Sequence, residues 1–178
     1  MYTSTFFAAL IAFASVPLFA SAKGTLGFSL GNKKADGSCK YQADYEDDFS
    51  AIQGASGSTI VRIYSASDCN TAQQILPAAK AKNFKVVLGV WPDTDASLAL
   101  DKTALLTYVG QYTDQVYAVT VGSETMYRGN FTGPELLLRI NDVRGVLPKG
   151  VKVGTADSWN KFADGTADAI IEGGVDIM

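Results

Sequence analysis

Short runs of apolar and β-branched residues recur along the chain at intervals of about 30 residues, close to the unit length of a (β/α)8 barrel. Runs such as Val86-Val87-Leu88-Gly89-Val90 are apolar at consecutive positions, which is typical of parallel strands buried between two layers. The pattern predicts six strands, at residues 25–30, 59–65, 85–91, 116–122, 151–156 and 175–178.

Between these runs, apolar residues recur at intervals of three and four, the spacing of one helix face. Two pairs with capping-box spacing predict helix starts, Asn70 with Gln73 and Thr132 with Glu135. The pair Gly173-Gly174 predicts the end of the fifth helix, before the sixth strand. The clearest helical faces are Tyr45, Phe49 and Ile52, and Leu136, Ile140, Val143 and Leu147.

The alternation of strands and helices predicts an α/β fold, and two architectures share it. A doubly wound open sheet usually carries a glycine-rich phosphate loop after its first strand, and no GxGxxG follows residues 25–30. Polar and aromatic side chains instead follow successive strands, as in the active sites of TIM barrels. We therefore expect residues 23–178 to form one partial (β/α)8 barrel, cut short after about five βα units and the start of strand six.

Composition removes several kinds of chemistry. The chain contains no histidine, which excludes Ser-His-Asp catalysis and imidazole zinc sites, and its two cysteines are too few for a thiolate metal site. We expect neither a metal nor another cofactor. The net charge is −3 and the sequence contains no basic cluster, so a nucleic-acid partner is not expected either. Carboxylates, hydroxyls and aromatic rings remain.

The first 22 residues carry no charge and include an apolar run at 6–14, followed by Pro17 and Ala20-Ser21-Ala22. This layout predicts a secretory signal peptide cleaved after Ala22. The alternative is a membrane anchor, but the run is shorter than the roughly 20 residues that span a bilayer. We expect a secreted, extracellular protein without a membrane span, in which Cys39 and Cys69 form a disulfide rather than two free thiols.

Glu124 is the candidate catalytic residue, because it alone among the four glutamates follows an apolar strand directly. Burial there raises the pKa of a carboxyl, which suits a proton donor to a glycosidic oxygen. The alternative is a glutamate that forms a salt bridge with Arg62 or Arg128. Position alone does not decide between these two hypotheses.

Other candidates lie at the ends of neighbouring strands. Aromatic rings there stack on sugar faces or, taken singly, serve only as packing. For the two aspartates, one expectation is that they bind sugar hydroxyls or adjust the pKa of Glu124. The alternative is that they cap a helix, as Asp93 does if the third helical segment begins nearby. The candidates are Tyr64, Trp91, Tyr127 and Trp159, with Asp93 and Asp157.

Several ordered motifs resemble one family. The stretch Ala118-Val119-Thr120-Val121-Gly122-Ser123-Glu124 and the following Met126-Tyr127-Arg128-Gly129 are similar to the acid/base motif of fungal cell-wall β-1,3-glucanases and glucanosyltransferases of glycoside hydrolase family 17. Other matching segments are Gly27-Phe28-Ser29-Leu30-Gly31, Arg62-Ile63-Tyr64, Asp68-Cys69-Asn70 and Asp157-Ser158-Trp159-Asn160.

The resemblance implies a retaining mechanism on cell-wall β-1,3-glucan, in which Glu124 is the acid/base and a second glutamate is the nucleophile. Ser123 stands where many relatives in the wider clan have asparagine. The family's nucleophile segment, Glu-x-Gly-Trp at strand seven, is absent from this chain. Two alternatives therefore stay open: a glucan-binding or wall-structural protein without catalysis, and an inverting hydrolase that pairs Glu124 with Asp157.

Asn130-Phe131-Thr132 is an N-glycosylation sequon in the loop predicted after the fourth strand. We expect a glycan on Asn130. The alternative is an unmodified asparagine beside a Thr132 that caps the next helix.

Overall fold

The computed structural model describes residues 25–178; the predicted signal peptide, residues 1–22, lies outside this range. Five parallel strands form one sheet in the order β1-β2-β3-β4-β5. This order does not reverse, whereas a doubly wound sheet reverses its strand order between two halves. The predicted parallel α/β fold is confirmed. The strands are β1 (Phe28–Ser29), β2 (Ile60–Arg62), β3 (Lys85–Val90), β4 (Val116–Val121) and β5 (Val153–Gly154).

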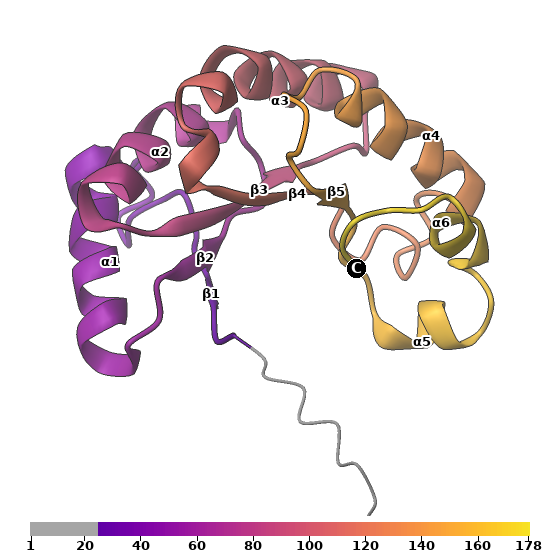
Figure 1. The fold of residues 1–178 in the computed structure, drawn as a ribbon, viewed down its shortest axis with the longest axis horizontal. Coiled ribbons are helices and arrows are strands. Elements are labelled where there is room, and N and C mark those ends of the chain that lie inside the picture. Colours follow the sequence, from indigo (N-terminus) through magenta and orange to yellow (C-terminus); the bar gives the residue numbers. More distant parts are fainter. Residues whose placement is uncertain (1–24) are drawn as a thin grey trace, which may run out of the picture.

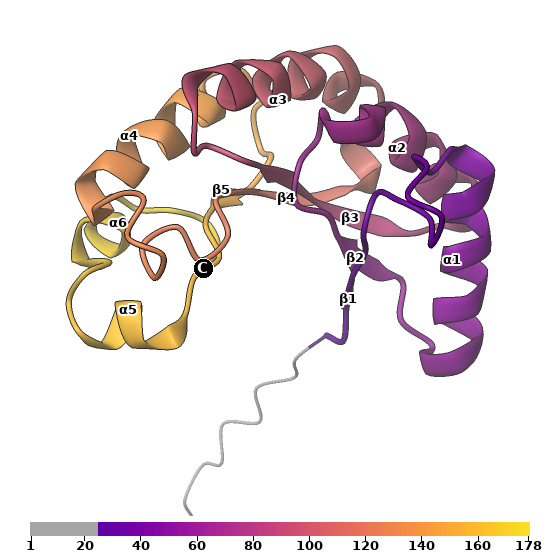
Figure 2. The same ribbon diagram turned by 180° about the vertical axis from the view of Figure 1, so that it is seen from behind.

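The helices lie along the outer side of an arc whose inner side is formed by the strands (Figures 1 and 2). The α-helices are α1 (Gln42–Ser56), α2 (Thr71–Lys82), α3 (Asp95–Tyr108), α4 (Gly133–Arg144), α5 (Trp159–Ala163) and α6 (Asp168–Glu172). Three short 3-10 helices are η1 (Asp68–Asn70), η2 (Val109–Gln111) and η3 (Thr113–Gln115).

The core lies between the strands and these helices, and the predicted helical faces supply much of it. Tyr45 and Phe49 of α1 are fully buried, and the Phe49 ring stacks on that of Phe84 with centroids 4.3 Å apart. Full burial of such a side chain stabilises the fold by about 1.5–3 kcal/mol. Leu136, Ile140 and Val143 of α4 are also fully buried, as their spacing predicts.

The predicted strands are longer than the observed ones. The first predicted run contributes only two residues to β1, which pairs on one side with β2. The last run, 175–178, makes a single parallel bridge between Ile177 and Gly154. Apolar composition marks where a strand runs, but hydrogen bonds to a neighbour decide how many of its residues count as strand.

One predicted helix cap is wrong. Asn70 makes no side-chain capping bond to α2, because its backbone is left-handed, with φ of 53°, as is that of the preceding Cys69. Thr71 instead donates its hydroxyl to the Asp68 carbonyl at 2.6 Å. The other predicted pair is confirmed in part: the Glu135 carboxylate accepts from the N–H and the hydroxyl of Thr132, both at 2.8 Å.

The predicted fifth helix is two short helices, α5 and α6. Gly165, with φ of 86°, turns the chain between them, and the Asp164 carboxylate accepts from the N–H and hydroxyl of Thr166. A carboxylate that bonds to nearby backbone in this way competes with helix continuation. Gly173 follows the last residue of α6, as its position predicts.

The predicted disulfide between Cys39 and Cys69 is confirmed, with Cα atoms 5.4 Å apart. It joins the loop before α1 to the segment before α2, so the first two units are linked covalently. Within residues 25–178, none of the helices has both the length and the apolar character needed to cross a bilayer.

Candidate active site

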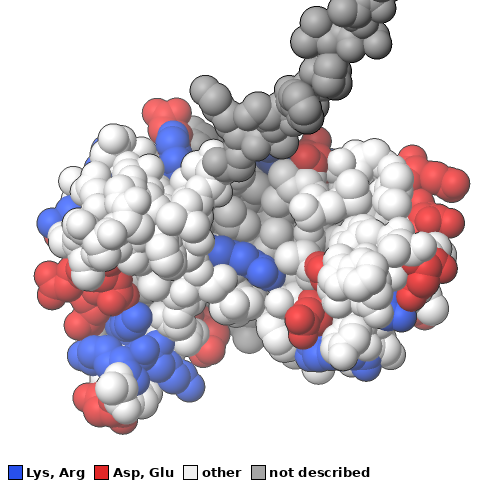
Figure 3. Space-filling view, turned by 90° about the horizontal axis from the view of Figure 1, so that it is seen from below, with Lys and Arg blue, Asp and Glu red and all other residues white. Residues whose placement is uncertain are grey.

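The candidate residues gather at one edge of the sheet because all five strands are parallel and end there. Alternate strand residues point to opposite faces. Val61 and Ile63 belong to the core under the helices, so Arg62 and Tyr64 point to the concave side. Figure 3 looks into this side, which is hollowed between two flanks and contains Lys or Arg atoms within the hollow.

Glu124 lies three residues after β4 in a strained turn. Its φ of 54° is in the left-handed region, which costs a non-glycine residue on the order of 1 kcal/mol. The turn starts at Gly122, with φ of 85°, where a Cβ would collide with the Thr125 hydroxyl. The Glu124 N–H donates to the Ala156 carbonyl at 2.9 Å, and its carbonyl accepts from the Arg128 N–H at 2.8 Å. This backbone framework presents the Glu124 side chain at the surface.

Arg62 is the cation that faces Glu124. Burial lowers the pKa of the Arg62 guanidinium, while the negative charge of Glu124 and the nearby Tyr64 act in the opposite direction. The Arg62 Cζ lies 4.9 Å from the centroid of the Tyr64 ring, and its buried Nε has no hydrogen-bond partner among residues 25–178. Within the same residues, neither Arg62 nor Arg128 forms an ion pair with Glu124. Glu124 therefore acts on Arg62 through its charge, without the direct salt bridge of the alternative hypothesis.

Arg128 connects the ends of β3 and β4. Its guanidinium lies 4.8 Å from the centroid of a Trp91 ring, 3.3 Å from the Asp93 carboxylate and 3.1 Å from the Ser123 carbonyl. The Asn130 amide also donates to Asp93, at 2.8 Å. Arg128 thus brings Trp91, Asp93 and Ser123 together. Asp93 does not cap α3, because Thr94 fills that position and accepts from the Ser97 N–H at 3.1 Å.

Asp157 fastens the Glu124 turn to the end of β5. Its carboxylate accepts backbone N–H groups from Met126 at 2.8 Å, Tyr127 at 3.1 Å and Ser158 at 2.8 Å. Both of its oxygens are engaged in these bonds. A carboxylate held in this way is suited to fixing the turn rather than to activating water.

Three of the four candidate aromatic side chains are exposed, which argues against a packing role for them. Tyr64 is 40% exposed, Tyr127 57% and Trp159 79%, whereas Trp91 is partly buried. Trp159 begins α5, and no hydrogen bond or ring contact joins it to the other candidates among the described residues. The structure therefore brings Trp91, Asp93 and Ser123 into one network and leaves Trp159 on its periphery.

Asp101 of α3 is a residue that the sequence analysis missed. It is fully buried, and its Oδ1 accepts from the Ser65 hydroxyl at 2.8 Å and from the N–H and hydroxyl of Ser67 at 2.8 and 2.6 Å. Its Oδ2 accepts from the Trp91 N–H at 2.7 Å. The available signal was an aspartate between Leu98 and Leu105 on the buried face of the helix.

The chain is similar to known proteins over most of its length. The model of the "BtgE/BtgC glycoside hydrolase domain" family matches residues 27–178. The chain is 59% identical over 165 residues to a glucan 1,3-beta-glucosidase of Arthroderma benhamiae, covering 93% of this chain and 53% of that protein. It is 41% identical over 182 residues to a glucan 1,3-beta-glucosidase of Saccharomyces cerevisiae, with coverages of 93% and 58%.

A solved structure supports the same relationship. An active-site mutant of Rhizomucor miehei beta-1,3-glucanosyltransferase in complex with laminaritriose superposes with a TM-score of 0.71 at 28% identity, covering 84% of this chain and 54% of that chain. A crystal structure of a glycoside hydrolase family 17 beta-1,3-glucanosyltransferase from Rhizomucor miehei superposes with the same TM-score, 0.71, at 27% identity. The chain spans about half the length of the relatives it matches.

Proposed function

The chain belongs to the family of BtgE/BtgC glycoside hydrolase domains, and from this premise we propose that its protein cleaves or rearranges β-1,3-glucan in a fungal cell wall. The names of its relatives support this substrate, since they include glucan 1,3-beta-glucosidases and a beta-1,3-glucanosyltransferase bound to laminaritriose. The proposal includes secretion through the leader at residues 1–22.

The proposed architecture is a (β/α)8 barrel of which residues 25–178 form an arc. Five parallel strands in unbroken sequence order support it, as does the superposition on a glucanosyltransferase of about twice the length. In such barrels the active site is built from the segments that follow the strands. That is the edge at which Tyr64, Trp91 and Glu124 lie.

The observation that carries the proposal is the placement of Glu124. Among residues 25–178 it is the only glutamate in a segment that directly follows a strand, since Glu46, Glu135 and Glu172 lie on helices α1, α4 and α6. Its strained turn is held by hydrogen bonds to Ala156 and Arg128. Such strain, sustained by its surroundings, is a feature of functional sites.

In the proposed mechanism, Glu124 protonates the leaving glycosidic oxygen while a second carboxylate attacks the anomeric carbon. Glu124, as the resulting base, then takes a proton from water or from a sugar hydroxyl that displaces the enzyme. Retaining carboxylates lie about 5–5.5 Å apart. The Glu135 carboxylate is bonded to Thr132 at the start of α4, and Glu46 and Glu172 also lie on helices, so we assign the nucleophile to a part of the protein after residue 178.

The concave side supplies the proposed glucan-binding surface. The exposed rings of Tyr64, Tyr127 and Trp159 offer stacking surfaces for sugar faces, and Trp91 borders them. Asp93 and Ser123 complete the proposed set through their contacts with Arg128. For Asp157 we propose an indirect role, in which it holds the turn that carries Glu124. This disfavours an inverting mechanism with Asp157 as the base.

We also propose that Asn130 carries a glycan. It lies in an exposed loop before α4, as a modified asparagine requires. The Thr132 hydroxyl of the sequon donates to Glu135, and the Asn130 amide donates to Asp93. Attachment of a glycan therefore requires that this loop open, or that Asn130 be modified before the loop folds.

The test is the substitution Glu124→Gln in the intact protein, with Glu46→Gln on α1 as the matched control. Loss of the proton should lower turnover of laminarin by about 10²–10⁴-fold, because general acid–base catalysis contributes that much. Binding of laminaritriose should remain, since the amide keeps the shape of the side chain. Glu46→Gln should act as the parent. Cleavage of laminarin by Glu124→Gln at the parent rate would overturn the assignment.

The competing function is a glucan-binding or wall-structural protein without catalysis. The same experiment separates it, because such a protein binds laminaritriose and releases no reducing ends and no transfer products in either form. The exposed rings are compatible with both functions, whereas a strained glutamate turn at the carboxyl edge favours the enzyme.

A further inference from the structure

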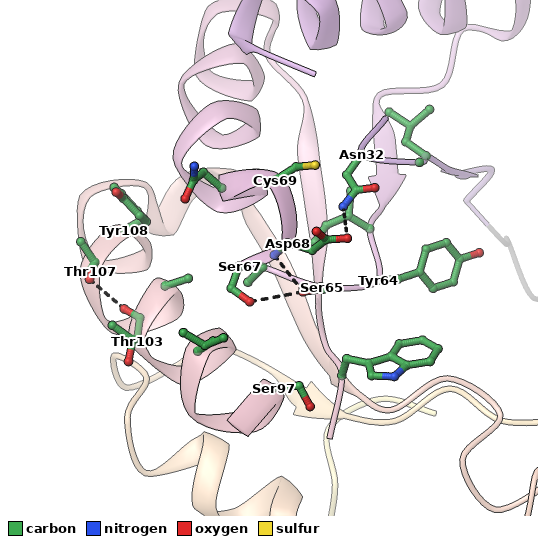
Figure 4. Close-up of a pocket in the computed structure, with 18 residues that line it drawn as sticks. Asn32, Tyr64, Ser65, Ser67, Asp68, Cys69, Ser97, Thr103, Thr107 and Tyr108 are labelled. Carbon is green, nitrogen blue, oxygen red and sulfur yellow. Dashed lines mark hydrogen bonds between the residues drawn. The ribbon is translucent and has the colours of Figure 1, made fainter. Parts of the chain in front are cut away.

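A groove of about 820 Å³ lies beside the candidate active site, between α3 and the loop that joins β2 to α2. Figure 4 shows Tyr64 at one end of its lining residues and Thr107 and Tyr108 at the other, with Ser65 and Ser67 between them. The volume is within the range of about 300–1,000 Å³ typical of ligand pockets.

The wall formed by α3 combines apolar and hydroxyl-bearing side chains. Leu100, Ala104 and Tyr108 recur every four residues and form an apolar strip, beside which lie Thr103 and Thr107. The two threonine hydroxyls donate to the helix carbonyls of Ala99 and Thr103, at 2.9 and 2.7 Å, so their oxygens remain available as acceptors. Such a surface matches a sugar, whose rings have apolar C–H faces and hydroxyl edges.

The charges of the groove favour a neutral ligand. No lysine or arginine lines it, and its one carboxylate, that of Asp68, accepts from the Asn32 amide at 2.7 Å. An anionic ligand such as a nucleotide or sugar phosphate finds no cation there.

The groove is continuous with the concave side of the molecule. Tyr64 and Trp91 line the groove, and each ring is also contacted by an arginine of the candidate active site, Arg62 and Arg128 respectively. The wall is also fixed in place, because buried Asp101 bonds both the Ser67 loop and the Trp91 backbone. A chain that passes Tyr64 and Trp91 therefore enters a pre-formed channel.

We propose that this groove is a secondary binding site for a β-1,3-glucan chain that extends from the active site over Tyr64 and Trp91 and along α3. The inference rests on the proposed function and adds to it a preference for long chains. A short oligosaccharide is held at the concave side alone, whereas a long chain also occupies the groove.

The test uses two leucines of the same helix with similar exposure. Leu100, 62% exposed, lines the groove, whereas Leu106, 67% exposed, does not. Leu100→Glu places a charge in the neutral channel and Leu106→Glu places the same charge outside it. A second groove variant, Thr103→Arg, fills the channel by bulk instead of charge. All are compared with the parent in the intact protein, after thermal melts establish equal folding.

Leu100→Glu and Thr103→Arg should raise KM for laminarin about tenfold, the effect of spoiling one apolar contact. The kcat for laminarin and the Kd for laminaritriose should stay at the parent values. Leu106→Glu should change none of them. The inference is overturned if both groove variants behave as Leu106→Glu, or if laminaritriose binding falls as much as laminarin affinity. If the parent itself neither binds nor turns over laminarin, the proposed function fails instead.

Discussion

Two flanks of the molecule meet at the candidate active site, and each fastens the carboxyl edge with an aspartate in a different way. In the flank from β1 to α3, Asp101 lies on a helix and is fully buried. In the flank from β4 to α6, Asp157 follows a strand and is partly exposed. Each carboxylate accepts the backbone N–H of a candidate residue. Asp101 accepts from Trp91, and Asp157 accepts from Tyr127.

The different burial of the two aspartates follows from the lengths of the helices in each flank. In the first flank, α1, α2 and α3 have 15, 12 and 14 residues, and the Cys39–Cys69 disulfide adds a covalent link. In the second, α5 and α6 have five residues each. A carboxylate at a strand end is therefore not by itself a substrate ligand, because the fold also uses such groups to tie its loops.

The largest effect on stability is expected at Asp101. In Asp101→Asn the amide oxygen can serve only one of the two sets of donors, so a buried backbone N–H of Ser67 or Trp91 loses its acceptor. Unfolding by denaturant should show a loss of about 3 kcal/mol, the cost of an unsatisfied buried donor plus a charged hydrogen bond.

Asp142→Asn is the control for this change. Asp142 forms an exposed ion pair with Lys102 at 2.6 Å, and such pairs contribute about 0–1 kcal/mol. If the two variants lose the same stability, burial does not distinguish Asp101.

The loss of stability expected at Asp157 is smaller than that at Asp101, and its effect is confined to the turn that carries Glu124. Asp157→Asn should destabilise the protein by about 1 kcal/mol, because water can reach the released N–H groups. Its effect should instead appear in catalysis: kcat for laminarin should fall, since the Glu124 turn loses its hydrogen bond from either Met126 or Tyr127 to Asp157, while the Kd for laminaritriose changes little.

Comparing Asp157→Asn with Asp101→Asn sharpens the distinction between the flanks. The Asp101 variant should weaken laminarin binding through Trp91 and the groove, and the Asp157 variant should slow turnover. An unchanged kcat in Asp157→Asn would show that Glu124 does not depend on this contact.

The smallest effect is expected at exposed Asp164, between α5 and α6. The hydrogen bond from the Thr166 hydroxyl, helped by the Thr166 N–H, lowers the pKa of this carboxyl from 3.8 to about 2. Because the folded pKa is the lower one, the stabilisation is present above pH 3.8 and is lost as pH falls toward 2.

Titration of the Asp164 carboxyl carbon by NMR measures this directly. The midpoint in the parent should lie near the lower value, and Thr166→Val should raise it by removing the hydroxyl donor. A parent midpoint of 3.8 would contradict the proposed turn geometry.

Much of the fold is determined locally and was predictable. Parallel strands buried on both sides require continuous apolar runs, and helices that cover them require spacings of three and four, as in Tyr45, Phe49 and Leu136. The two cysteines similarly leave one simple pairing. Placing Glu124 after β4 needed only the end of an apolar run.

Tertiary structure decided the rest, because it depends on which groups meet across the sheet. At strand ends and turns, backbone N–H groups lack a partner in the regular hydrogen-bond pattern and need other acceptors. The sequence does not say which carboxylate accepts from them. Hence the sequence does not single out Asp101, and it leaves open whether Asp157 binds sugar hydroxyls, adjusts Glu124 or caps a helix. It also predicts a helix cap at Asn70, which the left-handed backbone of that residue prevents. The groove along α3 also exists only once that helix packs beside the β2–α2 loop.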